Sequence, residues 1–307
     1  MNSKPPLRIG LVYPQTEFGD DPHAIRDYAQ AAENLGFSHI LAYDHVLGAN
    51  PQRPGGWQGV YSSQDAFHDP LVLFSYMAAF TRTIEFATGV IILPQRQTAL
   101  FARQAASLDL LSSGRLRLGV GLGWNSVEYT ALNENFHNRG KRIDEQVELL
   151  RKLWTEPLVT YNGRWHSIPD AGLNPLPKQR PIPIWFGGNS LPALKRAAAL
   201  GDGWIPGFRH PSDALQALES LDRFLQEAGR PGLGSETTGP GQVFGVDARI
   251  PYGDGHPEAW FSAVNSWHSA GATHLSFNTM GFNLSSPAGH LDAIHKIARS
   301  LGLDIQT

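Results

Sequence analysis

The chain of 307 residues contains no cysteine. This absence excludes disulfides, thiolate nucleophiles and cysteine metal ligands, and it fits a reducing cytoplasm. Net charge is small, since 25 basic and 28 acidic side chains sum to −3. This balance argues against nucleic acid or an anionic membrane as the main partner, because both need a basic face. Lysine is scarce and scattered, at Lys4, Lys141, Lys152, Lys178, Lys195 and Lys296.

Long apolar runs are also missing. No stretch approaches the roughly 20 consecutive apolar residues that cross a bilayer, and no apolar run of signal-peptide length follows the polar segment Met1 to Pro6. We therefore expect a cytoplasmic protein with no membrane contact. Apolar residues make up 41% of the chain and charged residues 17%, a globular composition. Because no segment has the composition of a long linker, we expect one domain over residues 1–307.

Short apolar runs with helical patterns between them recur along the chain. The runs are Leu7–Tyr13, His39–Tyr43, Ile84–Val90, Leu116–Val120, Ile184–Gly187, Trp204–Pro206, Val243–Arg249 and His274–Phe277. The helical patterns are Ala24–Leu35, Leu100–Leu111, Lys141–Trp154, Leu191–Leu200, Pro257–Ala270 and His290–Leu301. Strands that are apolar on both faces and alternate with helices indicate a parallel sheet. Eight such units predict an α/β fold of the (β/α)₈ TIM-barrel type, with an open doubly wound sheet as the alternative.

Three segments are longer than ordinary connections. Asp44–His68 follows the second strand and carries several aromatic residues among glycines and prolines. Thr155–Pro183 is an insertion between helix 4 and strand 5, with a hairpin expected over Leu158–Ile168 that turns at Asn162-Gly163. Residues 230–242 are glycine-rich. Loops of this length are usually lids or binding loops, and barrel enzymes keep their active sites at the carboxyl ends of the strands.

Polar and glycine residues gather at three of these strand ends. Asp44 and His45 close the second strand, where a histidine can act as general acid or base; the alternative is a turn cap beside a packed ring. Alternating glycines at 119, 121 and 123 close the fourth strand and permit a planar ligand to approach the backbone. Glu128 follows, either as an acid/base group or as a helix-start glutamate.

The fifth strand ends in Gly187-Gly188-Asn189-Ser190 before a helix. Free backbone N–H groups at a helix start favour a phosphate, although a tight turn with an Asn or Ser cap explains the same residues. The sequence contains no His-Glu-x-x-His, Gly-x-Ser-x-Gly or Walker motif, and its histidines show no ligand spacing, so we predict no metal site. A barrel mouth with aromatic residues and glycines but no nucleophile suits a cofactor with its own reactivity.

These landmarks, in this order, resemble the bacterial luciferase-like superfamily of flavin and deazaflavin oxidoreductases, and most closely its branch that depends on coenzyme F420. The likeness extends from about Leu7 to Pro206. Its motifs are Ala-Tyr-Asp-His at 42–45, Thr-Gly-Val at 88–90, Ser-Gly-Arg-Leu-Arg-Leu-Gly-Val-Gly-Leu-Gly-Trp-Asn-Ser-Val-Glu-Tyr at 113–129, Arg-Gly-x-Arg at 139–142, Pro-Ile-Trp-Phe-Gly-Gly-Asn-Ser at 183–190 and Gly-Asp-Gly-Trp at 201–204.

The resemblance implies a TIM barrel with an insertion, and a flavin-type ring beside Asp44 and the catalytic His45. It implies a non-proline cis peptide near Gly89–Val90. The residues implied to bind the cofactor are Asp44, Thr88, Gly89, Val90, Leu122 and Gly123, with Gly187, Gly188, Asn189 and Ser190 at its phosphate. The family's sugar-phosphate dehydrogenases carry a catalytic glutamate where this chain has Trp124, so that substrate is not carried over. Phe18, Trp57 and Trp124 suggest an apolar substrate instead.

We therefore expect an oxidoreductase that uses F420 for hydride transfer to or from a small organic molecule. One alternative is an FMN-dependent two-component monooxygenase with a separate reductase. Others are a non-catalytic flavin-binding protein and a metal-dependent barrel hydrolase or aldolase. A homodimer or higher homo-oligomer is expected from the apolar outer faces of barrel helices.

Overall fold

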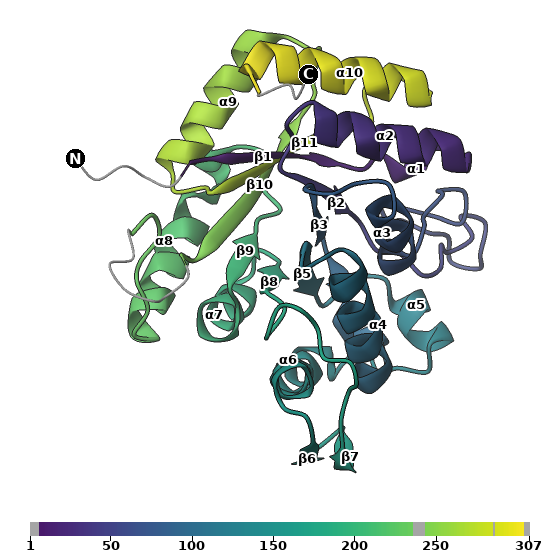
Figure 1. Ribbon diagram of the computed structural model, residues 1–307, viewed down its shortest axis with the longest axis vertical. Coiled ribbons are helices and arrows are strands. Elements are labelled where there is room, and N and C mark those ends of the chain that lie inside the picture. Colours follow the sequence, from purple (N-terminus) through teal and green to yellow (C-terminus); the bar gives the residue numbers. More distant parts are fainter. Residues whose placement is uncertain (1–5, 236–242, 285, 304–307) are drawn as a thin grey trace.

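The computed structural model describes residues 6–235, 243–284 and 286–303, so much of the expected loop at 230–242 lies outside the described residues. The described chain forms a closed barrel of parallel strands with helices outside, and the predicted TIM barrel is confirmed (Figure 1). Its strands are β1 (Arg8–Val12), β2 (His39–Ala42), β3 (Glu85–Thr88), β5 (Leu116–Gly121), β8 (Ile184–Gly187), β9 (Gly203–Ile205), β10 (Gly245–Pro251) and β11 (His274–Asn278). The pairing of β3 with β5 closes the ring.

Two strands differ from the expected ranges by more than one residue at an end. β3 ends at Thr88, the peptide bond between Gly89 and Val90 is cis as predicted, and a two-residue strand β4 (Ile91–Ile92) then pairs with β5. β10 lies two residues later than expected. Its full pairing with β11, from Asp247 to Pro251, fixes that register.

Six helices follow the expected patterns closely. They are α2 (Pro22–Asn34), α4 (Thr98–Leu111), α6 (Arg139–Thr155), α7 (Leu191–Leu200), α9 (Pro257–Ser269) and α10 (Pro287–Leu301). α2 shows why such helices start where they do: the Asp21 carboxylate accepts a hydrogen bond from the His23 N–H at 2.9 Å, and Pro22 occupies the first turn. Figure 1 shows α10 beside α2, so the last helix covers the barrel next to the first.

Other helices add to this pattern. They are α3 (Pro70–Ala78), α8 (Pro211–Glu227), the short α1 (Gln15–Phe18) and α5 (Ser126–Ala131), and one 3₁₀ turn, η1 (Leu93–Gln95). The sequence of α3 is apolar almost throughout, so it shows no helical period. Its start is set by the Asp69 carboxylate, which accepts from the N–H groups of Leu71 at 2.9 Å and Val72 at 3.2 Å. Among the helices of the described chain, none has both the length and the apolar character needed to cross a bilayer.

The predicted insertion is a hairpin of β6 (Val159–Asn162) and β7 (Ser167–Ala171) between α6 and β8. The turn covers residues 163–166 rather than centring on Asn162-Gly163. The Glu145 carboxylate on α6 accepts hydrogen bonds from the backbone N–H groups of Arg164, Trp165 and His166, each at 2.9 Å. These bonds fasten the turn to α6 and outweigh the effect of burial, so the pKa of Glu145 is lowered.

A polar layer crosses the barrel interior. The Arg117 guanidinium of β5 lies 2.9 Å from the Asp247 carboxylate of β10, and the Ser276 hydroxyl of β11 donates to that carboxylate at 2.9 Å. The His39 Nε2 of β2 lies 3.2 Å from it. Although burial opposes ionisation, His39 and Arg117 hold the pKa of Asp247 far below its usual range. One buried carboxylate thereby connects four strands.

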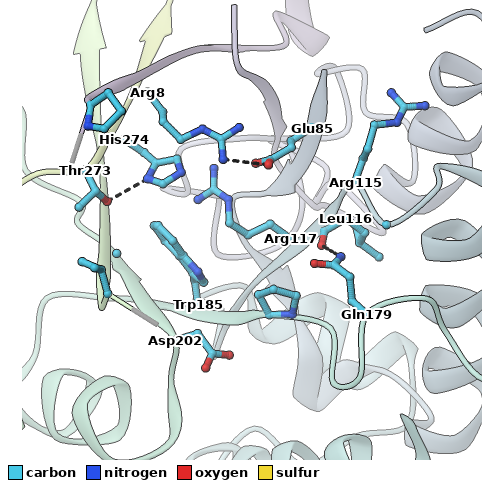
Figure 2. Close-up of a pocket in the computed structure, with 15 residues that line it drawn as sticks. Arg8, Glu85, Arg115, Leu116, Arg117, Gln179, Trp185, Asp202, Thr273 and His274 are labelled. Carbon is cyan, nitrogen blue, oxygen red and sulfur yellow. Dashed lines mark hydrogen bonds and ion pairs between the residues drawn. The ribbon is translucent and has the colours of Figure 1, made fainter. Parts of the chain in front are cut away.

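The amino ends of the strands enclose a pocket of about 340 Å³ below this layer. Figure 2 shows Arg8, Arg117, Trp185 and His274 around it, with Arg8 paired to Glu85 at 2.9 Å. The Arg117 guanidinium also stacks on Trp185, 4.2 Å from the ring centroid. The Asp247 carboxylate already balances the charge of Arg117. The pocket therefore borders the polar layer on the side of the amino ends of the strands.

The Asp247→Asn substitution removes the charge that balances buried Arg117. We expect the free energy of unfolding to fall by about 3–5 kcal/mol, because breaking a buried ion pair leaves one partner uncompensated. Urea unfolding measures the change. The matched control is Glu227→Gln in the exposed pair with Arg223 on α8, where a loss below about 1 kcal/mol is expected. Equal losses in the two variants would contradict the structural role of the layer.

Candidate active site

A cavity of about 770 Å³ opens at the carboxyl ends of the barrel strands, on the opposite side of the polar layer. Segments that follow β2, β3, β5 and β8 supply most of its wall, and α6, α7 and β10 complete it. A cavity of this size holds a cofactor-sized ring system. The predicted residues that line it are Asp44, His45, Gly89, Val90, Leu122, Gly123, Trp124, Gly187, Gly188 and Ser190. The structure thus brings the strand-end residues together, while their roles toward a ligand stay predictions.

Phe18, one of the predicted substrate residues, does not line this cavity. Its side chain is 1% exposed, and its ring centroid lies 5.2 Å from those of both Tyr13 and Tyr28. The short helix α1 folds back on the barrel and buries Phe18 in this aromatic cluster. Phe18 therefore belongs to the core and not to the cavity wall.

Three other predicted residues lie just behind the cavity wall. The Thr88 hydroxyl is buried and donates to the Gly119 carbonyl at 2.7 Å. The Asn189 side-chain oxygen accepts from the Gly207 N–H at 2.8 Å. Trp57 packs against Trp124, with ring centroids 5.7 Å apart. Asn189 and Trp57 thus hold the wall residues Gly207 and Trp124 in place, and direct contact of the three residues with a ligand stays a prediction.

Asp44 acts as an anchor in this wall. One carboxylate oxygen accepts from Arg96 Nη2 at 2.7 Å, and the other accepts from the Ile92 N–H at 3.0 Å. Arg96 also reaches Asp69 at 3.0 Å. Burial raises the pKa of Asp44, while Arg96 and the Ile92 N–H oppose that rise. Both oxygens are engaged, so Asp44 fixes the start of the long loop relative to β4.

Glu128 and His45 form a dyad. One carboxylate oxygen of Glu128 lies 3.1 Å from His45 Nδ1 and accepts from the Val46 N–H at 3.0 Å; the other accepts from Gln95 at 3.0 Å. Burial alone would raise the pKa of Glu128, but the hydrogen bonds from His45, Gln95 and the backbone outweigh burial and lower it. An ionised carboxylate accepts only, so His45 Nδ1 carries a hydrogen and Nε2 is left for a substrate.

Aromatic rings surround His45 on its other sides. Ring centroids of Tyr61, Phe67 and Trp124 lie 5.0, 4.8 and 5.6 Å from that of His45. Trp57 holds the loop closed, because its indole N–H donates to the Tyr61 carbonyl at 2.7 Å. The long loop after β2 and Trp124 thus form an apolar cover over the His45 imidazole, which can exchange a proton.

The glycines of β5 and β8 make room for Val90. A Cβ at Gly121 would lie 2.5 Å from Val90 Cγ2, and a Cβ at Gly187 would lie 2.7 Å from Val90 Cγ1. The Val90 side chain therefore projects across the ends of both strands and forms part of the cavity wall. The absence of a Cβ at Gly121 and Gly187 therefore makes space for the Val90 side chain first of all, and for a ligand beside it.

The start of α7 forms the polar corner of the cavity. Ser190 is its N-cap and makes no side-chain capping bond, and Gly188 has a φ of +112°, a conformation that favours glycine. Arg196 lines this corner, ion-paired with Asp144 and donating to the Gly140 carbonyl at 2.8 Å. Arg139 lines it too. Uncapped N–H groups beside guanidinium groups suit a phosphate.

Sequence reasoning missed Arg139, Arg196 and Arg249 as cavity residues, and it left the partner of Glu128 open. In the structure Arg249 lies two places after the inward Asp247 on β10, so it points inward as well. In the described chain, no group of three His, Asp or Glu side chains is placed to hold a metal ion. The metal-dependent alternative therefore lacks a ligand set there.

The chain is similar to known proteins in sequence and in fold. Residues 6–296 match the family model of luciferase-like monooxygenases. The chain is 35% identical over 208 residues to an uncharacterized protein of Mycobacterium tuberculosis, covering 66% of this chain and 71% of that one. It is 31% identical over 273 residues to an F420-dependent glucose-6-phosphate dehydrogenase of Segniliparus rotundus, covering 85% and 72%. The crystal structure of monooxygenase RslO1 from Streptomyces bottropensis matches in fold, with a TM-score of 0.76, 19% identity and coverage of 96% and 98%.

The Glu128→Ala substitution removes the acceptor that ties the long loop to α5. We expect a loss of about 1–3 kcal/mol in unfolding free energy, because buried donors lose their partner. We also expect faster proteolysis within residues 46–68 and loss of the single Nδ1–H form of His45 in ¹⁵N NMR. Glu128→Gln, which keeps one acceptor, restores part of each signal. Glu219→Ala on the exposed face of α8 is the control, and a His45 spectrum unchanged by Glu128→Ala would contradict the dyad.

Proposed function

Because the chain belongs to the luciferase-like monooxygenase family, we propose that it binds the deazaflavin coenzyme F420 at the barrel mouth and exchanges a hydride with a small organic substrate. The chain is an enzyme of a flavin and deazaflavin oxidoreductase family, and its relatives with assigned activities include F420-dependent dehydrogenases. The choice of F420 over FMN, the reaction and the site residues are the proposal.

The residues at the mouth fit a flavin-type ring. Val90 offers an apolar support, and Gly121 and Gly187 leave the backbone beside it uncovered. The His45–Glu128 dyad lines the same cavity, as do Gly188 and Ser190 at the start of α7. A flavin-type cofactor has a ring with a polar edge and, further along, a phosphate. Its ring would suit Val90 and the His45–Glu128 dyad, and its phosphate would suit the start of α7.

The observation that favours F420 is a basic groove that continues from the phosphate corner. It has a volume of about 410 Å³ and shares Arg196 with the cavity. Lys141 and Arg164 lie exposed along it, and its acidic residue, Asp144, is already paired with Arg196. FMN ends at its phosphate, whereas F420 continues into a lactyl and glutamyl tail that carries carboxylates. Basic side chains beyond the phosphate corner suit that tail.

The proposed chemistry assigns a proton to His45. When bound, the deazaflavin supplies or accepts the hydride. With its hydrogen on Nδ1, His45 takes a proton on Nε2 from a substrate hydroxyl during oxidation, and for reduction the imidazolium form donates the Nε2 proton to a carbonyl oxygen. Glu128 fixes the tautomer that leaves Nε2 available, and the rings of Tyr61, Phe67 and Trp124 limit the access of water.

Several expectations remain part of this proposal: a single domain over residues 1–307, a homodimer or higher homo-oligomer, and a cytoplasmic location. If FMN were the cofactor, a separate reductase would be needed as a partner.

The cofactor assignment is tested by titrating the purified full chain with F420, with its tail-less deazaflavin precursor and with FMN, followed by fluorescence. We expect F420 to bind at least about tenfold more tightly than either of the others, since several charge-assisted bonds to the tail are lost in them. The double variant Lys141→Ala/Arg164→Ala should lose this preference, whereas Arg223→Ala on α8 should keep it. Tighter binding of FMN would favour the monooxygenase, and failure of all three below millimolar would overturn the proposal.

The role of His45 is tested with any substrate that the intact chain reduces. We expect His45→Ala to lower turnover by roughly 10²–10⁴-fold, the usual contribution of general acid–base catalysis. Affinity for F420 should stay within about threefold, because the phosphate corner and Val90 are untouched. Unchanged turnover would remove the proposed role.

A further inference from the structure

Arg249 stands on the far wall of the cavity from Val90. It lies on β10, two residues after Asp247, whose carboxylate points into the barrel interior. Residues two apart on a strand share a face, so Arg249 also points inward, one step closer to the carboxyl end. It lines the cavity there, between the polar layer and the opening.

The charge of Arg249 has no acidic partner. Within the described residues it forms no ion pair, and its side-chain hydrogen bond runs from Nη2 to the Pro206 carbonyl at 3.0 Å. Its guanidinium also lies 5.7 Å from the Tyr43 ring centroid. A guanidinium presents five N–H donors, so most of its donors remain open to the cavity.

Neighbouring groups do not supply the missing negative charge. The carboxylates that line the cavity, Asp44 and Glu128, are fully engaged with other partners. Burial raises the pKa of Tyr61 to about 12, so its phenol is neutral beside Arg249. Of the two other cavity arginines, Arg196 is paired with Asp144, and Arg139 donates to the Phe136 carbonyl at 2.6 Å and stacks on the Phe136 ring. Arg249 is therefore a cavity cation that no acidic side chain of the described chain compensates.

We propose that Arg249 is the recognition residue for a carboxylate on the substrate, and that the substrates are small organic acids whose reacting carbon lies toward His45. This inference rests on the proposed function and names its substrate class. It revises the expectation of an apolar substrate: Tyr61 and Trp124 in the cavity wall take the hydrocarbon part, and Arg249 takes the charge.

A carboxylate suits the site better than a phosphate. A single planar guanidinium matches the two oxygens of a carboxylate in a bidentate pair. A phosphate dianion usually recruits several cations, and no lysine lines this cavity in the described chain.

The test measures binding to the full chain without cofactor, by intrinsic tryptophan fluorescence. The probes are benzoate, its neutral analogue benzamide, and phenylphosphonate. We expect benzoate to bind at least about tenfold more tightly than benzamide, and the preference to vanish in Arg249→Met, which keeps the side-chain length. Arg249→Lys should recover part of it. Thermal unfolding checks that each variant is folded.

Two control variants locate the anion. Arg223→Met, on the exposed face of α8, should leave the preference intact. If Arg249→Met keeps the preference and Arg196→Met loses it, the anion binds at the phosphate corner and the proposal is overturned. Tighter binding of phenylphosphonate than of benzoate at Arg249 would overturn the carboxylate assignment. F420 binding without any acid preference would refute this inference alone, whereas an acid preference without F420 binding would refute the proposed function alone.

Discussion

The barrel interior depends on the contacts that the buried Asp247 carboxylate makes with the strands around it. It lies among a guanidinium, an imidazole and a hydroxyl from three other strands, all removed from water. Burial lowers the pKa of His39, while the Asp247 carboxylate beside it opposes that fall. Such a layer costs desolvation, but it gives each strand one required register. It also separates the amino-terminal pocket from the carboxyl-terminal cavity.

Above this layer the interior changes to small apolar side chains, with Val12, Leu41 and Ala87 packed together. These packed side chains separate the polar layer from the cavity. The wall is then assembled by side chains that restrain one another: Asp44 holds Ile92, and Glu128 holds His45 and the start of the long loop. Precision at the mouth thus comes from carboxylates that bind protein groups and are not themselves available to a ligand.

The barrel was predictable because short, mostly apolar runs recur along the chain and helical patterns separate them. The cavity was predictable where strands end in polar residues or glycines, as at His45 and Gly187, since parallel strands gather their carboxyl ends at one rim. The position of Phe18 was not, because a four-residue helix that folds back leaves no periodic signal. The pairing of His45 with Glu128 was also hidden, because contact between segments 83 residues apart depends on packing. Arg249 lay in a weakly patterned strand whose register is fixed by its pairing with β9 and β11.

The pairing of β1 with β11 has a consequence for how the chain reaches this structure. Five residues of the first strand, Arg8 to Val12, pair with five of the last, His274 to Asn278. The polar layer likewise joins β2 to β10 and β11. During synthesis these partners are separated by most of the chain, so a ribosome-bound nascent chain holds an open sheet with two unpaired edges. Contacts of such high sequence separation slow folding, and edge strands that wait for their partner are open to aggregation or chaperone capture.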